Sequence, residues 1–159
     1  DLLFVDVKNN KTFLKDVDID ELNYFSQLPN AKVYEDNDNM GKALVLSAET
    51  EKIILEKIDL GKFELKINLY KSRFERKAFG DYIKMKGVAL QPNPCPINRN
   101  VTHPNINVQS ICLGEAHDAV INSVKHFRFS DAFELTVNML KNVSDEDLVE
   151  IFANPNVTL

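Results

Sequence analysis

Phe63-Glu64-Leu65-Lys66-Ile67-Asn68-Leu69 alternates between apolar and polar side chains along its whole length. Because successive side chains of a β-strand point to opposite faces, this alternation predicts a strand with one buried and one exposed face. A second strand is expected over residues 82–90, where Ile83 and Met85 share a face. Gly87 is a candidate β-bulge that would bring the next apolar residues onto that face. The two segments predict part of an antiparallel meander.

The residues before this pair predict further strands. Residues 31–34 and 43–46 are rich in apolar side chains, and a polar, turn-like stretch over residues 35–39 with Gly41 separates them. Residues 53–55 fit either a strand or a helical turn. The meander is therefore expected to begin near residue 31.

A short helix is expected over residues 19–28, ahead of the meander. Leu22, Phe25 and Leu28 recur every three positions, acidic residues occupy the first turn, and Pro29 ends the run. Residues 1–16 read as a hairpin that would extend the domain at its N-terminus.

The C-terminal part of the chain predicts helices. One helical stripe contains Phe129, Phe133, Val137 and Leu140. Ser130 is a candidate N-cap for this helix, and a last helix is expected to begin at Ser144. The order is an N-terminal helix, an antiparallel β-meander, an active-site loop and C-terminal helices, which predicts an α+β fold.

Composition limits the function classes. The 159 residues are expected to form a single domain over 1–159, and the net charge of −5 without a basic stripe argues against a nucleic-acid partner. No apolar run approaches the roughly 20 residues that cross a bilayer, so no membrane partner is expected. Two cysteines do not form a disulfide framework and fit a reducing compartment, so a cytoplasmic location is expected.

Residues 103–113 contain the strongest functional signal and read His-Pro-Asn-Ile-Asn-Val-Gln-Ser-Ile-Cys-Leu. A cysteine thiolate is a strong nucleophile that accepts an acyl group as a thioester. Cys112 is therefore the candidate nucleophile. A carboxamide placed nearby stabilises the oxyanion formed when an amine attacks, and removing such a donor costs about 3–4 kcal/mol of barrier.

This run resembles the active-site signature of the ubiquitin-conjugating enzymes, in which H-P-N-I, a short turn and G-x-I-C-L follow one another. The resemblance implies a UBC-like fold and a ubiquitin-like protein carried as a thioester on Cys112 and passed to an amine. It assigns support of the tetrahedral intermediate to Asn105, and it gives His103 and Pro104 the role of holding the loop. The implied partners are a ubiquitin-like protein, an activating enzyme, and a protein substrate or ligase. No cofactor or metal is implied, because the ATP-dependent step belongs to the activating enzyme.

Several features differ from the usual pattern of that family. The turn before Cys112 is one residue shorter than the commonest form, Ser110 stands where glycine is usual, and the sequence has no tryptophan. The first helix is acidic, whereas typical members have a basic one. These differences fit a divergent bacterial or phage-type member.

Other residues near Cys112 give supporting candidates and alternatives. Glu115, His117 and Asp118 follow it closely and could orient the incoming amine, although His117 also fits an ordinary surface histidine. One alternative is a non-catalytic module of the same fold that binds a ubiquitin-like protein. A less favoured one is a Cys/His hydrolase or metal site built from Cys112 and the histidines at 103, 117 and 126, whose spacing matches no standard zinc pattern.

Overall fold

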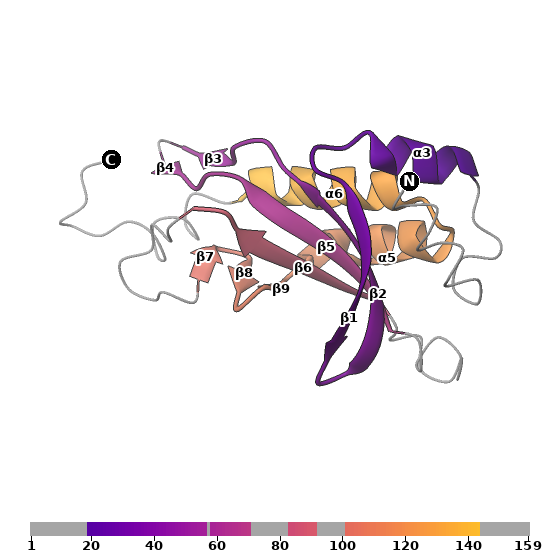
Figure 1. Ribbon diagram of the computed structural model, residues 1–159. Coiled ribbons are helices and arrows are strands. Elements are labelled where there is room, and N and C mark those ends of the chain that lie inside the picture. The colour runs from indigo at the N-terminus through magenta and orange to yellow at the C-terminus, as the bar shows by residue number, and fades with distance from the viewer. Residues whose placement is uncertain (1–18, 57, 71–82, 92–100, 144–159) are drawn as a thin grey trace.

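The computed structural model describes residues 19–56, 58–70, 83–91 and 101–143. These residues form an α+β fold, in which an antiparallel sheet has helices packed against one of its faces (Figure 1). The elements are α3 (Ile19–Ser26), β1 (Lys32–Asp38), β2 (Gly41–Glu49), β3 (Ile54–Leu55), β4 (Ile58–Asp59), β5 (Phe63–Tyr70), β6 (Ile83–Ala89), β7 (Val101–His103), β8 (Ile106–Asn107), β9 (Ser110–Ile111), a 3-10 turn η1 (Gly114–Ala116), α5 (His117–Lys125) and α6 (Phe129–Lys141).

The main sheet has the strand order β1-β2-β5-β6-β9-β8-β7, and all of its pairs are antiparallel. The strand predicted from the alternation of residues 63–69 is confirmed as β5, in the interior of this sheet. Its side chains at Leu65 and Ile67 are buried under the helices. The ambiguous residues 53–55 contain a short strand, β3, which pairs with β4.

The strands predicted at 31–34 and 43–46 are confirmed, but both are longer than expected. The polar stretch predicted as a turn continues β1 as far as Asp38, and only two residues connect it to Gly41. Asp38 Oδ1 accepts a hydrogen bond from the Met40 N–H at 2.8 Å, and Gly41 has a φ of 105° that favours glycine. A side-chain bond therefore closes a tighter turn than composition alone predicts.

The bulge predicted at Gly87 is wrong. The pairing of β5 with β6 runs in regular register through Leu65↔Gly87. Gly87 instead lies against the β8–β9 hairpin, where an added Cβ would approach Ile106 Cδ1 to 2.9 Å and Ile111 Cδ1 to 3.2 Å. The missing side chain therefore makes room for another strand pair, which is the second common use of glycine inside a strand.

The helices form the other layer of the core. The helix predicted over 19–28 is confirmed as α3, although it ends at Ser26, and Phe25 packs edge-on against Phe129 of α6 with ring centroids 6.5 Å apart. The apolar stripe predicted from Phe129 to Leu140 is confirmed as α6. The predicted cap at Ser130 is wrong, because the helix begins at Phe129 and Arg128 occupies the N-cap without a side-chain bond. The predicted hairpin over 1–16 and the helix from Ser144 lie outside the described residues.

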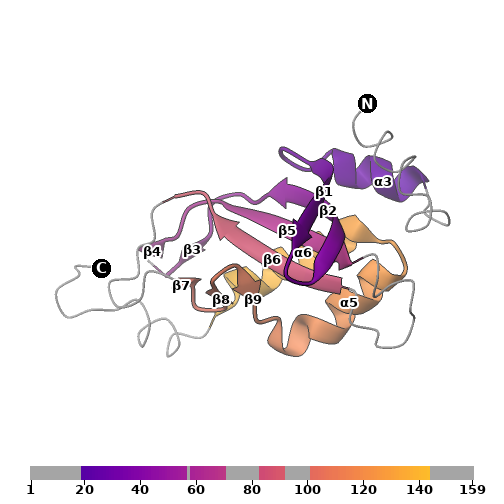
Figure 2. The ribbon, with the colours of Figure 1, turned by 60° about the horizontal axis from the view of Figure 1, so that its bottom comes forward.

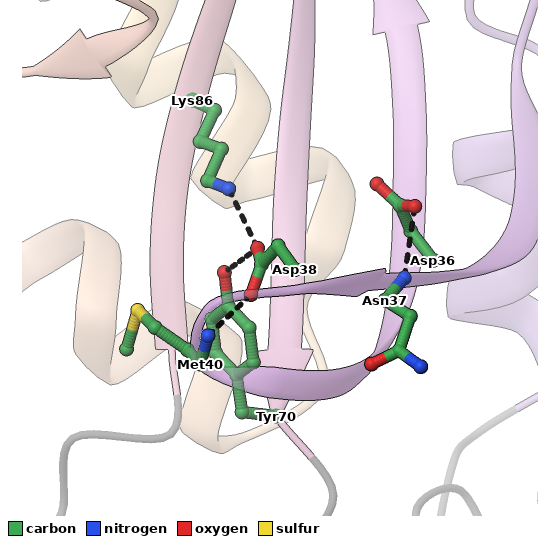
Figure 3. A network of polar contacts seen from close by, with 6 residues as sticks. All are labelled: Asp36, Asn37, Asp38, Met40, Tyr70 and Lys86. Carbon is green, nitrogen blue, oxygen red and sulfur yellow. Dashed lines mark hydrogen bonds and ion pairs between the residues drawn. The ribbon is translucent and has the colours of Figure 1, made fainter.

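A polar cluster joins three strands on the sheet face opposite the helices (Figure 3). Tyr70 donates a hydrogen bond to Asp38 Oδ2 at 2.6 Å, and Lys86 Nζ lies 3.0 Å from the same oxygen. Burial alone raises the pKa of Asp38, but hydrogen bonds from Tyr70, Lys86 and the Met40 N–H outweigh it and hold the pKa below its ordinary value. The cluster ties the β1–β2 turn to β5 and β6.

Candidate functional site

Cys112 and Asn105 lie opposite each other at the open end of the β8–β9 hairpin. The hairpin pairs Asn107 with Ser110 and Ile106 with Ile111, and the Cys112 N–H donates to the Asn105 carbonyl at 2.8 Å. Ile106 and Ile111 are buried, 1% and 9% exposed. Because side chains alternate along each strand, Asn105 and Cys112 point to the side away from these two isoleucines. Backbone pairing therefore brings the two candidate catalytic residues together.

A two-residue turn closes this hairpin. Only Val108 and Gln109 connect the paired residues at 107 and 110, and both have positive φ values, of 48° and 67°. Two consecutive left-handed residues are typical of a type I′ turn, for which Asn-Gly is the usual sequence. A β-branched valine there is strained, and its side chain is 68% exposed. The short turn preserves the pairing that sets Asn105 opposite Cys112.

His103 holds the start of this hairpin from inside the protein. Its side chain is fully buried, and its ring meets Phe63 edge-on at 6.0 Å. The Asn105 N–H donates to Nδ1 at 2.9 Å, so Nε2 carries the proton and donates to the Leu140 carbonyl at 2.7 Å. Burial lowers the pKa of His103 to about 4, against the opposing effect of the bond to Leu140. With both nitrogens occupied, this imidazole can act neither as a base for the thiol nor as a metal ligand without breaking a bond.

Pro104 lies between His103 and Asn105, at the bend where β7 returns into β8. His103 and Ile106 pair across this bend, with Pro104 and Asn105 as its two connecting residues. Proline has a fixed φ and no N–H to satisfy, so it suits a bend of this kind. Figure 2 shows β7, β8 and β9 at one side of the sheet and beside α6.

The two candidate residues line one shallow hollow of about 450 Å³ between the hairpin and α6. Cys112 is exposed there as a free thiol. The carboxamide of Asn105 donates through Nδ2 to Met139 Sδ at 3.3 Å. The other lining residues come from the segment after the cysteine, from one stripe of α6 and from the residue that caps this helix: Leu113, Gly114, Glu115, Ala116, Leu135, Asn138, Met139 and Asn142.

The supporting candidates after Cys112 are divided between two places. Glu115 lines the same hollow as the cysteine. His117 and Asp118 lie in the first turn of α5, 3.2 Å apart, and line a different hollow on that helix. His126 is at the C-terminal end of α5, where its Nδ1 contacts the Asn122 carbonyl at 2.8 Å. The structure therefore brings Glu115, and neither of these two surface histidines, to the hollow that contains the thiol.

Among the residues that the structure describes, no group of three or more His, Cys, Asp or Glu side chains is placed to hold a metal ion. Within the described ranges no helix combines the length and the apolar character needed to cross a membrane. No family model, curated protein or solved structure matches this chain.

Sequence reasoning missed the contribution of α6 to this site. Leu135, Asn138 and Met139 fall at i, i+3 and i+4, which places them on one face of α6, and Asn142 follows as the C-cap of this helix. This face adjoins the buried stripe that was predicted. Periodicity shows that such a face exists, but it does not show which hairpin lies against it.

Proposed function

We propose that this protein is a ubiquitin-conjugating-like enzyme with a UBC-like fold, which carries a ubiquitin-like protein as a thioester on Cys112 and transfers it to an amine. The observation that carries this proposal is the placement of an exposed thiol and a carboxamide donor in one hollow, joined by the Cys112–Asn105 backbone hydrogen bond. The H-P-N-I and I-C-L segments supply those two groups. The proposed setting is the cytoplasm, where thiols remain reduced.

The proposed chemistry has two acyl transfers. In the first, the Cys112 thiolate attacks the thioester that joins the ubiquitin-like protein to its activating enzyme, and the thiolate of that enzyme leaves. In the second, an amine attacks the carbonyl carbon of the new thioester, and negative charge collects on the carbonyl oxygen. The carboxamide of Asn105 donates to this oxygen until the bond to the Cys112 sulfur breaks and the nitrogen loses its proton to solvent.

The roles proposed for the neighbouring residues follow from their contacts. His103 and Pro104 hold the loop, since the imidazole bonds both to the Asn105 backbone and to α6. Glu115 is assigned the attraction of the incoming amine, because it is the acidic residue among those lining the hollow around the thiol. His117 and Asp118 lie on a different hollow, so we assign them no step in either transfer.

The test is the intact mass of the protein, with and without reductant, after co-expression with its native neighbouring genes. A protein-sized adduct removed by reductant is expected, and Cys112→Ser should convert it to an ester that survives reductant. Cys95→Ser is the matched control, because Cys95 is the other cysteine of the sequence, and it should keep the labile adduct. An adduct that persists in Cys112→Ala would contradict the proposal. Binding of a ubiquitin-like protein without any adduct would support the non-catalytic module instead.

A further inference from the structure

The carboxamide of Asn105 is held by an unusual partner. Its Nδ2 donates to the thioether sulfur of Met139 at 3.3 Å. A thioether has no proton to donate and is a weak acceptor, so the amide nitrogen must be the group that faces it. The side chain is oriented by this contact, but the hydrogen bond that orients it is weaker than one to an oxygen.

The backbone of Asn105 is held separately and firmly. Its N–H donates to His103 Nδ1 at 2.9 Å, and its carbonyl accepts the Cys112 N–H at 2.8 Å. Both the backbone and the side chain are anchored on the last turn of α6, through the neighbouring residues Leu140 and Met139. A change at Met139 can therefore alter the carboxamide without releasing the loop.

We infer that Met139 is a positioning residue, whose sulfur holds the Asn105 carboxamide ready and releases it to the acyl group on Cys112. The inference rests on the proposed function and deepens it by naming a control on its transfer step. Hydrogen bonds to a charged acceptor are about twice as strong as neutral ones, so a developing oxyanion readily displaces a thioether as acceptor. An oxygen acceptor at position 139 would compete better with the developing oxyanion for the Asn105 amide group. An apolar side chain there would offer no acceptor to orient the carboxamide.

The experiment uses a small acyl donor, so it needs no activating enzyme. A short peptide thioester is incubated with the protein, and its acyl group moves to Cys112 as the small thiol leaves. Free lysine is then added, its amine forms an amide with the acyl group, and the Cys112 thiolate departs. Mass spectrometry follows both the loading rate and the discharge rate.

Met139→Gln is expected to slow discharge about tenfold, and Met139→Leu severalfold, while loading stays unchanged. Glu134→Gln is the matched control, because it introduces the same side chain at an exposed position of α6 that does not line the hollow, and it should discharge like the wild type. In an Asn105→Ala background, neither Met139 change should slow discharge further, because both act through the carboxamide.

Three outcomes would overturn the inference, and they are distinct. If Asn105→Ala slows discharge but Met139→Gln does not, the positioning role is wrong and the proposed chemistry stands. If Asn105→Ala discharges at the wild-type rate, the carboxamide takes no part, and both this inference and the proposed use of Asn105 fail. An effect of Met139→Gln that persists in the Asn105→Ala background would mean a general disturbance of α6 and would also overturn the inference.

Discussion

Replacing His103 by glutamine should remove a large part of the pH dependence of folding stability between about pH 6.5 and about pH 4. The wild-type imidazole is fully buried and neutral, and it donates to the Leu140 carbonyl while accepting from the Asn105 N–H. Glutamine does not titrate, and its amide nitrogen can still reach the Leu140 carbonyl. The substitution therefore shows how much of the pH dependence of folding stability comes from proton binding by this one buried side chain.

The sign and the size follow from the two pKa values. Burial lowers the pKa of His103 from 6.5 to about 4, so at intermediate pH the unfolded chain binds a proton that the folded protein does not. The free energy of unfolding therefore falls as pH falls through this window, and it is insensitive to His103 at higher pH. Each tenfold difference in proton affinity is worth about 1.4 kcal/mol, so the whole window corresponds to roughly 3 kcal/mol.

Urea unfolding at several pH values across this window measures the effect. At neutral pH, His103→Gln should be less stable than the wild type by about 1–3 kcal/mol, because the Asn105 N–H loses its acceptor. Towards acid pH the two curves should converge. His117→Gln is the control, since it removes a histidine whose side chain is 61% exposed and leaves the buried imidazole of His103 in place, so the loss of stability caused by His103 should remain. Parallel loss of stability in the wild type and in His103→Gln would refute a neutral, buried imidazole.

Two further substitutions test how the sheet is assembled. Gly87→Val should lower the free energy of unfolding by about 1–3 kcal/mol, because its Cβ would lie 2.9 Å from Ile106 Cδ1 and 3.2 Å from Ile111 Cδ1. An unchanged midpoint in urea unfolding would mean that the β8–β9 hairpin does not pack on β6 at this position. Tyr70→Phe should cost about 1 kcal/mol at neutral pH and move the pKa of Asp38 up toward its ordinary value, because it removes the 2.6 Å bond. This cost should shrink as pH falls and Asp38 becomes protonated, and NMR titration of the carboxylate would show an unmoved pKa if the bond were absent.

The spacing of apolar residues predicted the elements in which buried side chains recur at regular intervals along the chain. The strand at residues 63–69 and the helix containing Phe129 and Leu140 were both predicted, because each buried side chain recurs with the period of its own element. The roles of single residues were less well predicted. Gly87 fits a bulge and a close approach equally well by sequence, because both need the absence of a Cβ, and the structure decides for the close approach.

The candidate site was likewise predicted only in part from the sequence. The order of residues alone places an asparagine and a cysteine seven positions apart in one short motif, and a hairpin brings residues at this separation side by side. The contacts that hold this motif in place come from packing between distant parts of the chain. Leu140 of α6 accepts the hydrogen bond from His103 and lies 37 positions further along the chain than His103. Met139 of α6 holds the Asn105 carboxamide and lies 34 positions further along than Asn105. Such contacts depend on how α6 packs beside the β7–β9 strands, and no local periodicity records that packing.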